Sequence, residues 1–187
     1  MSLNYSEVEK LNSRELLEAI AYTHSHNIIH RDIKPDNLFY LPDGSVKISD
    51  FGISSHVGEK ATSDSIPGTI YYTAPEILRG NNPCIQSDIF SMGVLFFEIL
   101  TGAVPFDGKE TKDIVTSIVK KNTPLASDIY QTIPKALDRI IVKALRKRPG
   151  ERFQSANQFK RALENVMKDK KAFKVKRSWI ARFFGFK

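Results

Sequence analysis

The sequence predicts a mostly α-helical domain with one small β-hairpin, an α+β fold. Apolar residues recur at helical spacing within the first 25 residues, and residues 89–100 are almost entirely apolar. Between these segments, Asp43 and Gly44 separate two short apolar runs, as in a hairpin turn. Hydrophobic residues make up 41% and charged residues 26% of the 187 residues, which is typical of one globular domain with an appendage.

The first helix should end near residues 24–27, where polar side chains compete for the backbone hydrogen bonds. The hairpin should pair residues 38–41 with residues 46–48. Residues 53–69 are rich in Ser, Gly and Thr and show no apolar period, so they should form a long loop. The apolar stripe of the first helix consists of Leu11, Leu16, Leu17, Ile20 and Ala21.

The apolar stretch from Ile89 to Leu100 should be a fully buried core helix. It is too short to span a bilayer, and Glu98 interrupts it. Ser87 or Asp88 is the expected N-cap and Gly102 the expected C-cap. Further helices are expected at residues 110–121, 134–147 and 155–168, with prolines in the connections.

The net charge of +7 comes from the C-terminal end of the chain. Residues 167–187 hold eight Lys and Arg and one acid, Asp169; subtracting these from 28 basic and 21 acidic residues leaves 20 of each in residues 1–166. A nucleic-acid partner would rest on this tail alone, so we expect none. The sequence thus predicts a domain at residues 1–166 and a basic aromatic tail at 167–187.

The tail mixes its basic residues with aromatic ones, which favours contact with an anionic membrane surface. The alternatives are a juxtamembrane segment, a surface that packs on a partner, and a solvated tail. A single cysteine, Cys84, and the lack of a secretory signal predict a cytoplasmic setting, with membrane association through the tail. The aromatic residues of the tail are Phe173, Trp179, Phe183, Phe184 and Phe186.

Three short motifs follow one another along the chain. The first is His-Arg-Asp at residues 30–32, with Asn37 five positions after Asp32; Asp-Phe-Gly follows at 50–52 and Ala-Pro-Glu at 74–76. In this order and spacing they resemble the catalytic-loop and activation-segment motifs of eukaryotic-type Ser/Thr protein kinases. The resemblance covers roughly residues 5–166 and implies the C-terminal, large lobe of that fold, with the N-terminal β lobe absent.

The resemblance implies that Asp32 accepts the proton of the substrate hydroxyl. It also implies that Asn37 and Asp50 hold the Mg²⁺ ions that bridge the phosphates of ATP. The residue types suit this chemistry, because Mg²⁺ prefers hard oxygen ligands such as carboxylate and amide oxygens. A hairpin joins the two ligands, so its register should fix their separation.

Two further residues imply transfer of phosphate to Ser or Thr rather than to Tyr. By the resemblance, Lys34 contacts the phosphate of ATP that is transferred, and Thr69 bonds the catalytic Asp and Lys. Taken alone, Lys34 would fit a solvated surface lysine equally well.

Arg31, directly before Asp32, implies control by phosphorylation of the long loop, because a guanidinium offers a planar fork suited to phosphate. Thr62, Ser63 and Ser65 are the candidate acceptors on that loop. The alternative is that these hydroxyl residues only form the loop.

Three residues are expected to support the site without taking part in the chemistry. The resemblance implies a buried ion pair between Glu76 and Arg152 that braces the long loop. It also implies that Asp88 holds the backbone of the catalytic loop.

The sequence departs from the family pattern in one large respect. No Gly-x-Gly-x-x-Gly loop or Val-Ala-Ile-Lys strand is present, and the 29 residues before His30 are too few for an ATP-cradling β lobe. We therefore expect the C-terminal portion of a Ser/Thr kinase that moves the γ-phosphate of ATP to protein substrates. Alone it should be inactive, in need of the missing N-terminal lobe and prone to self-association. The alternative is a non-catalytic, pseudokinase-like binding or scaffold module, which the intact metal-ligand motifs disfavour.

Overall fold

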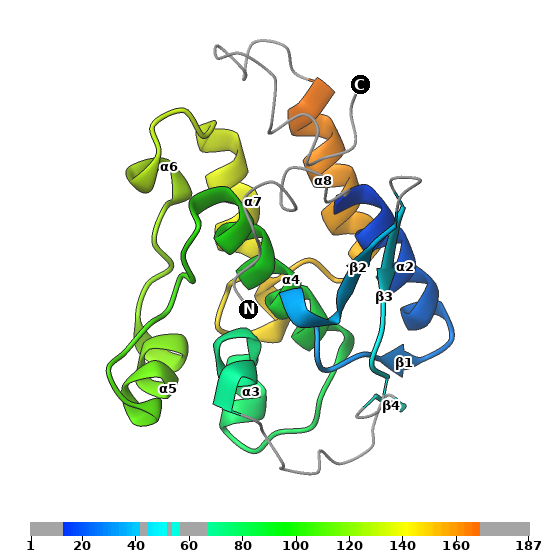
Figure 1. Ribbon diagram of the computed structural model, residues 1–187, viewed down its shortest axis with the longest axis horizontal. Helices are drawn as coiled ribbons and strands as arrows, with labels where there is room; N and C mark the ends of the chain where they lie inside the picture. Colours follow the sequence, from blue (N-terminus) through cyan, green and yellow to red (C-terminus); the bar gives the residue numbers. More distant parts are fainter. Residues whose placement is uncertain (1–12, 42–44, 52–53, 57–66, 169–187) are drawn as a thin grey trace.

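The structure is a computed structural model, and it describes residues 13–41, 45–51, 54–56 and 67–168. Helices dominate it, which confirms the predicted fold class (Figure 1). The central helix is α4 (Ile85–Thr101), whose residues are nearly all buried because the segment is apolar on almost every side. None of the helices in the described ranges is long and apolar enough to cross a membrane.

The helices α2 (Ser13–Ser25) and α8 (Ala156–Lys168) lie side by side, and α7 (Lys135–Ala144) packs against both α8 and α4 (Figure 1). Aromatic rings fill the space between α4 and α8. Phe96 meets Phe159 edge-on with ring centroids 5.4 Å apart, and Phe159 stacks on Phe153 at 4.9 Å. The helices predicted at 134–147 and 155–168 are confirmed, although α7 ends three residues early.

The remaining helices are α5 and several short helices in the connections. The helix predicted at 110–121 is confirmed as α5, but the short helices were not predicted. The 3₁₀ helices each begin with proline, whose fixed φ suits the first helical position. These elements are α3 (Pro75–Leu78), α5 (Thr111–Lys120), α6 (Ala126–Ile129), η1 (Pro35–Asn37), η2 (Pro67–Tyr72) and η3 (Pro149–Glu151).

The N-terminus of α4 differs from the prediction. The helix begins at Ile85 with Cys84 as N-cap, not at Ser87 or Asp88. The cause is a capping box: the Cys84 backbone N–H donates to Ser87 Oγ at 3.1 Å, so Ser87 lies one turn inside the helix. Asp88 is free for other contacts. At the C-terminus, Gly102 is the cap with a φ of 72°, as predicted.

The predicted hairpin is confirmed. Strand β2 (Leu38–Tyr40) pairs antiparallel with β3 (Val46–Ile48), with Leu38 opposite Ile48. The turn at residues 42–44 lies outside the described residues. Glu15 of α2 accepts a hydrogen bond from the Val46 backbone N–H at 2.9 Å, which fastens the hairpin to α2.

A second strand pair was not predicted. Strand β1 (Ile28–Ile29) pairs antiparallel with β4 (Ser55–His56). Of the two strands, β4 lies inside the segment predicted to be one long loop. Two residues are too few to show strand alternation, so the sequence carries no signal for this pairing. Residues 57–66 of the predicted loop and residues 169–187 of the predicted tail lie outside the described residues.

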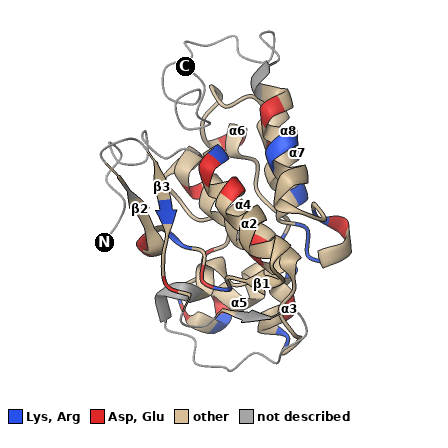
Figure 2. Ribbon diagram, turned by 90° about the vertical axis from the view of Figure 1, so that its right-hand side faces the viewer, with Lys and Arg blue, Asp and Glu red and all other residues tan. Residues whose placement is uncertain are grey.

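Both acidic and basic residues lie along α8, which runs beside α2 (Figure 2). Glu18 lies 3.0 Å from Arg14 Nε and 3.1 Å from Lys160 Nζ. Exposed pairs of this kind contribute little, about 0–1 kcal/mol each. The buried side chains of Leu16 and Ile20 therefore do more to hold α2 in place.

Candidate active site

Residues 30–37, the predicted catalytic loop, are fastened to α4 through one buried carboxylate, that of Asp88. Its Oδ2 accepts from the His30 backbone N–H at 2.8 Å, and its Oδ1 accepts from the Arg31 N–H at 2.9 Å. His24 Nε2 lies 2.8 Å from Asp88 Oδ2, also in the interior. Arg31 has a φ of 72°, a conformation that costs a non-glycine residue about 1–3 kcal/mol. Charge-assisted hydrogen bonds from the backbone to Asp88 offset this cost.

His30 joins the catalytic loop to the segment that carries Asp50. The ring is fully buried, and its Nδ1 accepts from the Asp32 backbone N–H at 3.3 Å. Nε2 therefore carries the hydrogen and donates to the Ser49 carbonyl at 3.0 Å. Burial lowers the pKa of His30 below its ordinary value despite nearby carboxylates, in keeping with a neutral ring. The ring also meets Phe51 edge-on, with centroids 4.6 Å apart.

Asp32 is buried, and its two carboxylate oxygens are in different situations. Oδ2 accepts from Lys34 Nζ at 2.8 Å and from Asn37 Nδ2 at 2.8 Å. Oδ1 has no hydrogen-bond partner among the described residues. A buried oxygen without a partner is uncommon and costly, so Oδ1 is the carboxylate oxygen that retains the capacity to accept a hydrogen bond.

Asn37 and Asp50 lie at the same end of the hairpin. Leu38 pairs with Ile48, and the Ser49 N–H donates to the Asn37 carbonyl at 2.9 Å. Asp50 directly follows Ser49, so the pairing of the hairpin brings it to the same end as Asn37. Asn37 Nδ2 also donates to the Asp32 carbonyl at 2.8 Å, so the amide oxygen is the atom left to ligate a cation. Asp50 has a φ of 63° and an exposed side chain.

This pair fits Mg²⁺ better than it fits a transition metal. Both ligands are hard oxygens, and Mg²⁺ is commonly held by one or two protein oxygens together with water and substrate phosphates. Within the described ranges, no group of three or more His, Cys, Asp and Glu side chains is placed to hold a metal ion. Substrate phosphates would have to complete the coordination.

Some predicted site residues lie outside what the structure describes. Thr62, Ser63 and Ser65 are among the residues not described, and for Thr69 only the backbone, within η2, is described. Arg31 is described and half-buried beside Asp32, and its backbone is the part held by Asp88. The proposed loop phosphorylation and the contacts of Thr69 remain predictions.

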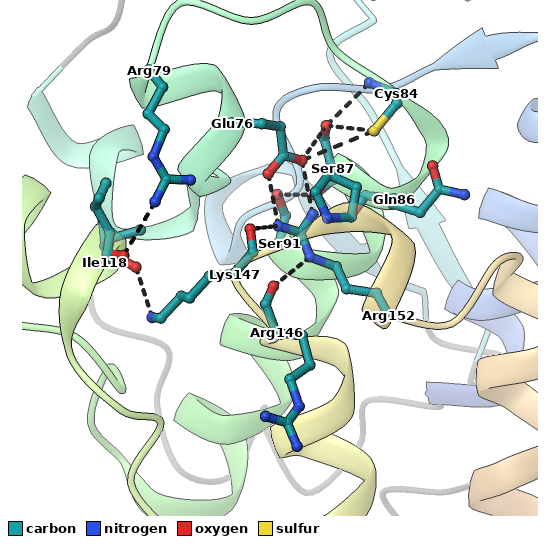
Figure 3. Close-up of polar contacts among 12 residues, drawn as sticks. Glu76, Arg79, Cys84, Gln86, Ser87, Ser91, Ile118, Arg146, Lys147 and Arg152 are labelled. Carbon is teal, nitrogen blue, oxygen red and sulfur yellow. Dashed lines mark hydrogen bonds and ion pairs between the residues drawn. The ribbon is translucent and has the colours of Figure 1, made fainter.

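Glu76 and Arg152 form the predicted ion pair, and it is buried (Figure 3). Arg152 Nη1 and Nη2 donate to the two carboxylate oxygens at 2.8 and 2.7 Å, and Ser87 Oγ donates to the same carboxylate at 2.8 Å. The other bonds of Arg152 go to three backbone carbonyls, those of Gln86, Arg146 and Lys147. Burial by itself raises the pKa of Glu76, but Arg152 and Ser87 more than offset this and hold it below its ordinary value.

The family model of the protein kinase domain matches residues 3–165. The chain belongs to the protein kinase family. This kinase chain is 36% identical over 151 residues to the serine/threonine-protein kinase PrkC of Bacillus subtilis, covering 79% of this chain and 23% of PrkC. It is 34% identical over 145 residues to PknL of Mycobacterium tuberculosis (76% and 36% covered) and 33% identical over 153 residues to PknB of Mycolicibacterium smegmatis (80% and 24% covered).

The kinase chain thus spans a quarter to a third of the length of these curated relatives, which are all named serine/threonine-protein kinases. Its assignment to the Ser/Thr protein kinases follows from the family model and these relatives. Members of this family generally use ATP and Mg²⁺ and act on protein substrates.

The kinase chain also has a polar pair near the site that sequence reasoning missed. Tyr72 of η2 donates its hydroxyl to Glu98 Oε2 of α4 at 2.5 Å. Burial raises the pKa of the Tyr72 hydroxyl strongly, and burial likewise raises the pKa of Glu98 although the bond from Tyr72 lowers it. The sequence does mark Glu98 as unusual, because it is an acid in an otherwise apolar stretch, but it does not identify its partner, which lies 26 positions away.

Proposed function

We propose that the protein containing this chain transfers the γ-phosphoryl group of ATP to Ser or Thr hydroxyls of protein substrates, and that this chain supplies the catalytic base and the metal ligands. The observation that carries the proposal is the buried carboxylate of Asp32. One of its oxygens is held by Lys34 and Asn37, and the other has no partner among the described residues.

The geometry suits acceptance of a hydroxyl proton. A substrate hydroxyl that donates to Asp32 Oδ1 would have its oxygen free to form the new O–P bond, while the bond from the γ-phosphorus to ADP breaks and the proton passes to Asp32. The Lys34 ammonium, 2.8 Å from Asp32 Oδ2, places a positive charge beside the site where negative charge moves during transfer. Mg²⁺ held by Asn37 and Asp50 would neutralise and orient the phosphates.

Turnover should need more than these 187 residues. A glycine-rich loop and a phosphate-pairing strand lysine are not among them, and phosphoryl transfer depends on positioning and charge stabilisation rather than on covalent chemistry by the protein. We therefore propose that an N-terminal lobe supplies the ATP-cradling groups, and that the 187 residues alone bind ATP too weakly to catalyse transfer.

Replacement of Asp32 by Asn tests the proposal in a protein that joins this chain to such a lobe. The rate of phosphate transfer to a protein substrate should fall by at least about 10²-fold, the usual loss when a positioned base is removed. The matched control is Asp128→Asn, an exposed carboxylate on α6, which should leave the rate unchanged.

A phosphorylation assay with radiolabelled ATP and a thermal melt of each variant make the comparison. Activity of the Asp32→Asn protein within a few-fold of the parent, with both proteins folded, would overturn the assignment of the base. No activity in the parent, with ATP bound, would favour the scaffold module instead.

A further inference from the structure

The exposed face of α7 and of the segment that follows it carries positive charge only. Between Lys135 and Arg148, every exposed residue is a Lys or an Arg. The one acid of this stretch, Asp138, is buried and accepts a hydrogen bond from the Ser127 backbone N–H at 3.0 Å, so it does not face solvent beside them. We call the five exposed residues the basic row; they are Lys135, Arg139, Lys143, Arg146 and Arg148.

The row follows the outer side of α7. Lys135, Arg139 and Lys143 lie four residues apart, a spacing that places side chains above one another on a helix, about 6 Å apart along its axis. The opposite side of α7 is buried, where the helix packs against α4 and α8. Past the end of α7, the side chain of Arg146 points away from the cluster around Arg152 (Figure 3). The row therefore presents its charges to solvent along α7 and beyond its end.

Carboxylates of the described residues leave most of this row without a counter-charge. The first four members of the row form no ion pair with them, and the nitrogen of Arg148 is 3.9 Å from Glu151. Other surface cations differ, since Arg14 and Lys160 both pair with Glu18. Like charges four residues apart destabilise a helix slightly, so the row does not serve the stability of α7. An anionic partner outside the domain would supply the missing charge.

Exposed apolar side chains lie near the start of the row. The short helix α6 packs against α7, and its Ile129 is 46% exposed, while Tyr130 directly after it is 51% exposed. The helix α6, the first turn of α7 and the last turn of α8 lie at the same end of the molecule, the upper end in Figure 1. The sequence that follows α8, residues 169–187, combines Lys and Arg with five aromatic residues. Basic and apolar groups thus occur together at this end.

We propose that the basic row and the exposed apolar residues of α6 form a surface that binds anionic membrane lipids. The basic side chains contact the charged headgroups, while Ile129 and Tyr130 enter the layer between headgroups and acyl chains. An acidic protein segment would match the row alone, whereas a membrane also suits the apolar side chains and the basic aromatic sequence after α8. That sequence has a net positive charge, so it does not neutralise the row. The sequence predicted membrane contact through the tail; the row extends it to the folded domain.

The test is co-sedimentation of the 187-residue chain with vesicles of mixed phosphatidylcholine and phosphatidylserine. A variant that combines Lys135→Gln, Arg139→Gln and Lys143→Gln should bind these vesicles at least about tenfold more weakly, because each basic residue at an anionic surface changes partitioning about fivefold. Vesicles of phosphatidylcholine alone lack the anionic groups, so parent and variant should bind them equally.

A second triple variant is the matched control. Lys109→Gln, Lys120→Gln and Lys121→Gln remove the same charge from exposed positions at α5, away from the end that holds α6 (Figure 1). Charges farther from the membrane than a Debye length of about 8–10 Å are largely screened, so this variant should bind within about twofold of the parent. Because all six positions are exposed, thermal melts should show both variants folded.

Protection of single lysines from an amine-acetylating reagent locates the contact on the unaltered chain. Peptide mass spectrometry should show that anionic vesicles slow acetylation of Lys135 and Lys143 but not that of Lys109 and Lys121. Equal protection of the two sets, or a loss of binding no larger for the row variant than for the control variant, would overturn the proposal. Binding to polyglutamate that depends on the row, without such dependence for vesicles, would also overturn it and would indicate an acidic protein partner.

Discussion

At the scale of single residues, the ring of His30 joins the catalytic loop to the segment that carries Asp50. One ring nitrogen accepts from the Asp32 backbone and the other donates to the Ser49 carbonyl. A protonated ring would carry hydrogen on both nitrogens, and the Asp32 N–H would then face another donor. His30 therefore makes the site sensitive to acid.

Lowering the pH should destabilise the protein through His30. Burial holds its pKa below the ordinary value of 6.5, so on acidification the unfolded chain takes up the proton before the folded one. The stabilisation is fully present above a pH of about 6.5 and is lost as the pH falls from there through the folded pKa. Urea unfolding near pH 7.5 and near pH 5 should show the smaller free energy of unfolding at the lower pH.

A His30→Gln variant provides the control for this effect. It lacks the titrating ring, so it should be less stable than the parent near pH 7.5 but should lose less additional stability on acidification. An equal loss on acidification in both proteins would show that another group carries the pH dependence.

Replacement of Arg152 by Ala should be among the most damaging single changes. The side chain is 2% exposed, and its loss leaves the buried Glu76 carboxylate without a counter-charge and removes a donor from three carbonyls. Breaking a buried pair on one side typically costs about 3–5 kcal/mol of unfolding free energy. Arg148→Ala removes a side chain that is 85% exposed, and it should change stability by no more than about 0.5 kcal/mol. Denaturant curves of similar midpoint for the two variants would contradict this prediction.

At the scale of elements, α4 and α7 approach closely at Gly93. A Cβ atom at this position would lie 2.9 Å from Ala144 Cβ and 3.0 Å from Leu145 Cδ2. The closest contact is with a short side chain that has no room to turn aside, so the hydrogen atom of Gly93 sets the distance between the two helices.

Gly93→Ala should destabilise the protein although alanine is the better helix former. The gain in helix propensity is about 1 kcal/mol, and overpacking of a core contact costs about 1–3 kcal/mol, so we expect a net loss of about 1 kcal/mol. Gly150→Ala is the control, since an added Cβ there meets nothing within 4 Å. If the melting temperature of Gly93→Ala equals or exceeds that of the parent, the two helices can move apart at no cost in stability.

The longer elements could be predicted from the sequence, whereas the short ones could not. The helices α5, α7 and α8 and the hairpin β2–β3 each extend over enough residues to show a period or a turn signal. Strands β1 and β4 have two residues each and exist because tertiary contacts bring Ile28 opposite His56. The start of α4 was misplaced because Ser87, a good N-cap by type, serves one turn inside the helix.

At the scale of the whole molecule, the candidate site combines segments from distant parts of the chain. The motifs identified Asp32, Asn37 and Asp50, because these residues lie at fixed spacing on one loop and hairpin. No spacing rule identifies the bond from Tyr72 to Glu98, or the contact of His24 with Asp88. Such pairs depend on where the apolar core places η2 and the end of α2 relative to α4, rather than on the polar residues themselves.

The contacts of Asp88 also bear on the order in which the chain acquires its shape. They join residues 58 and 64 positions apart, so the ends of a long loop must meet before they form. Until then nothing favours the left-handed backbone of Arg31. During synthesis, residues 30–32 leave the ribosome well before α4 does. A nascent chain therefore carries the catalytic motif before it has a catalytic loop, and the loop takes its working form only once the central helix is in place.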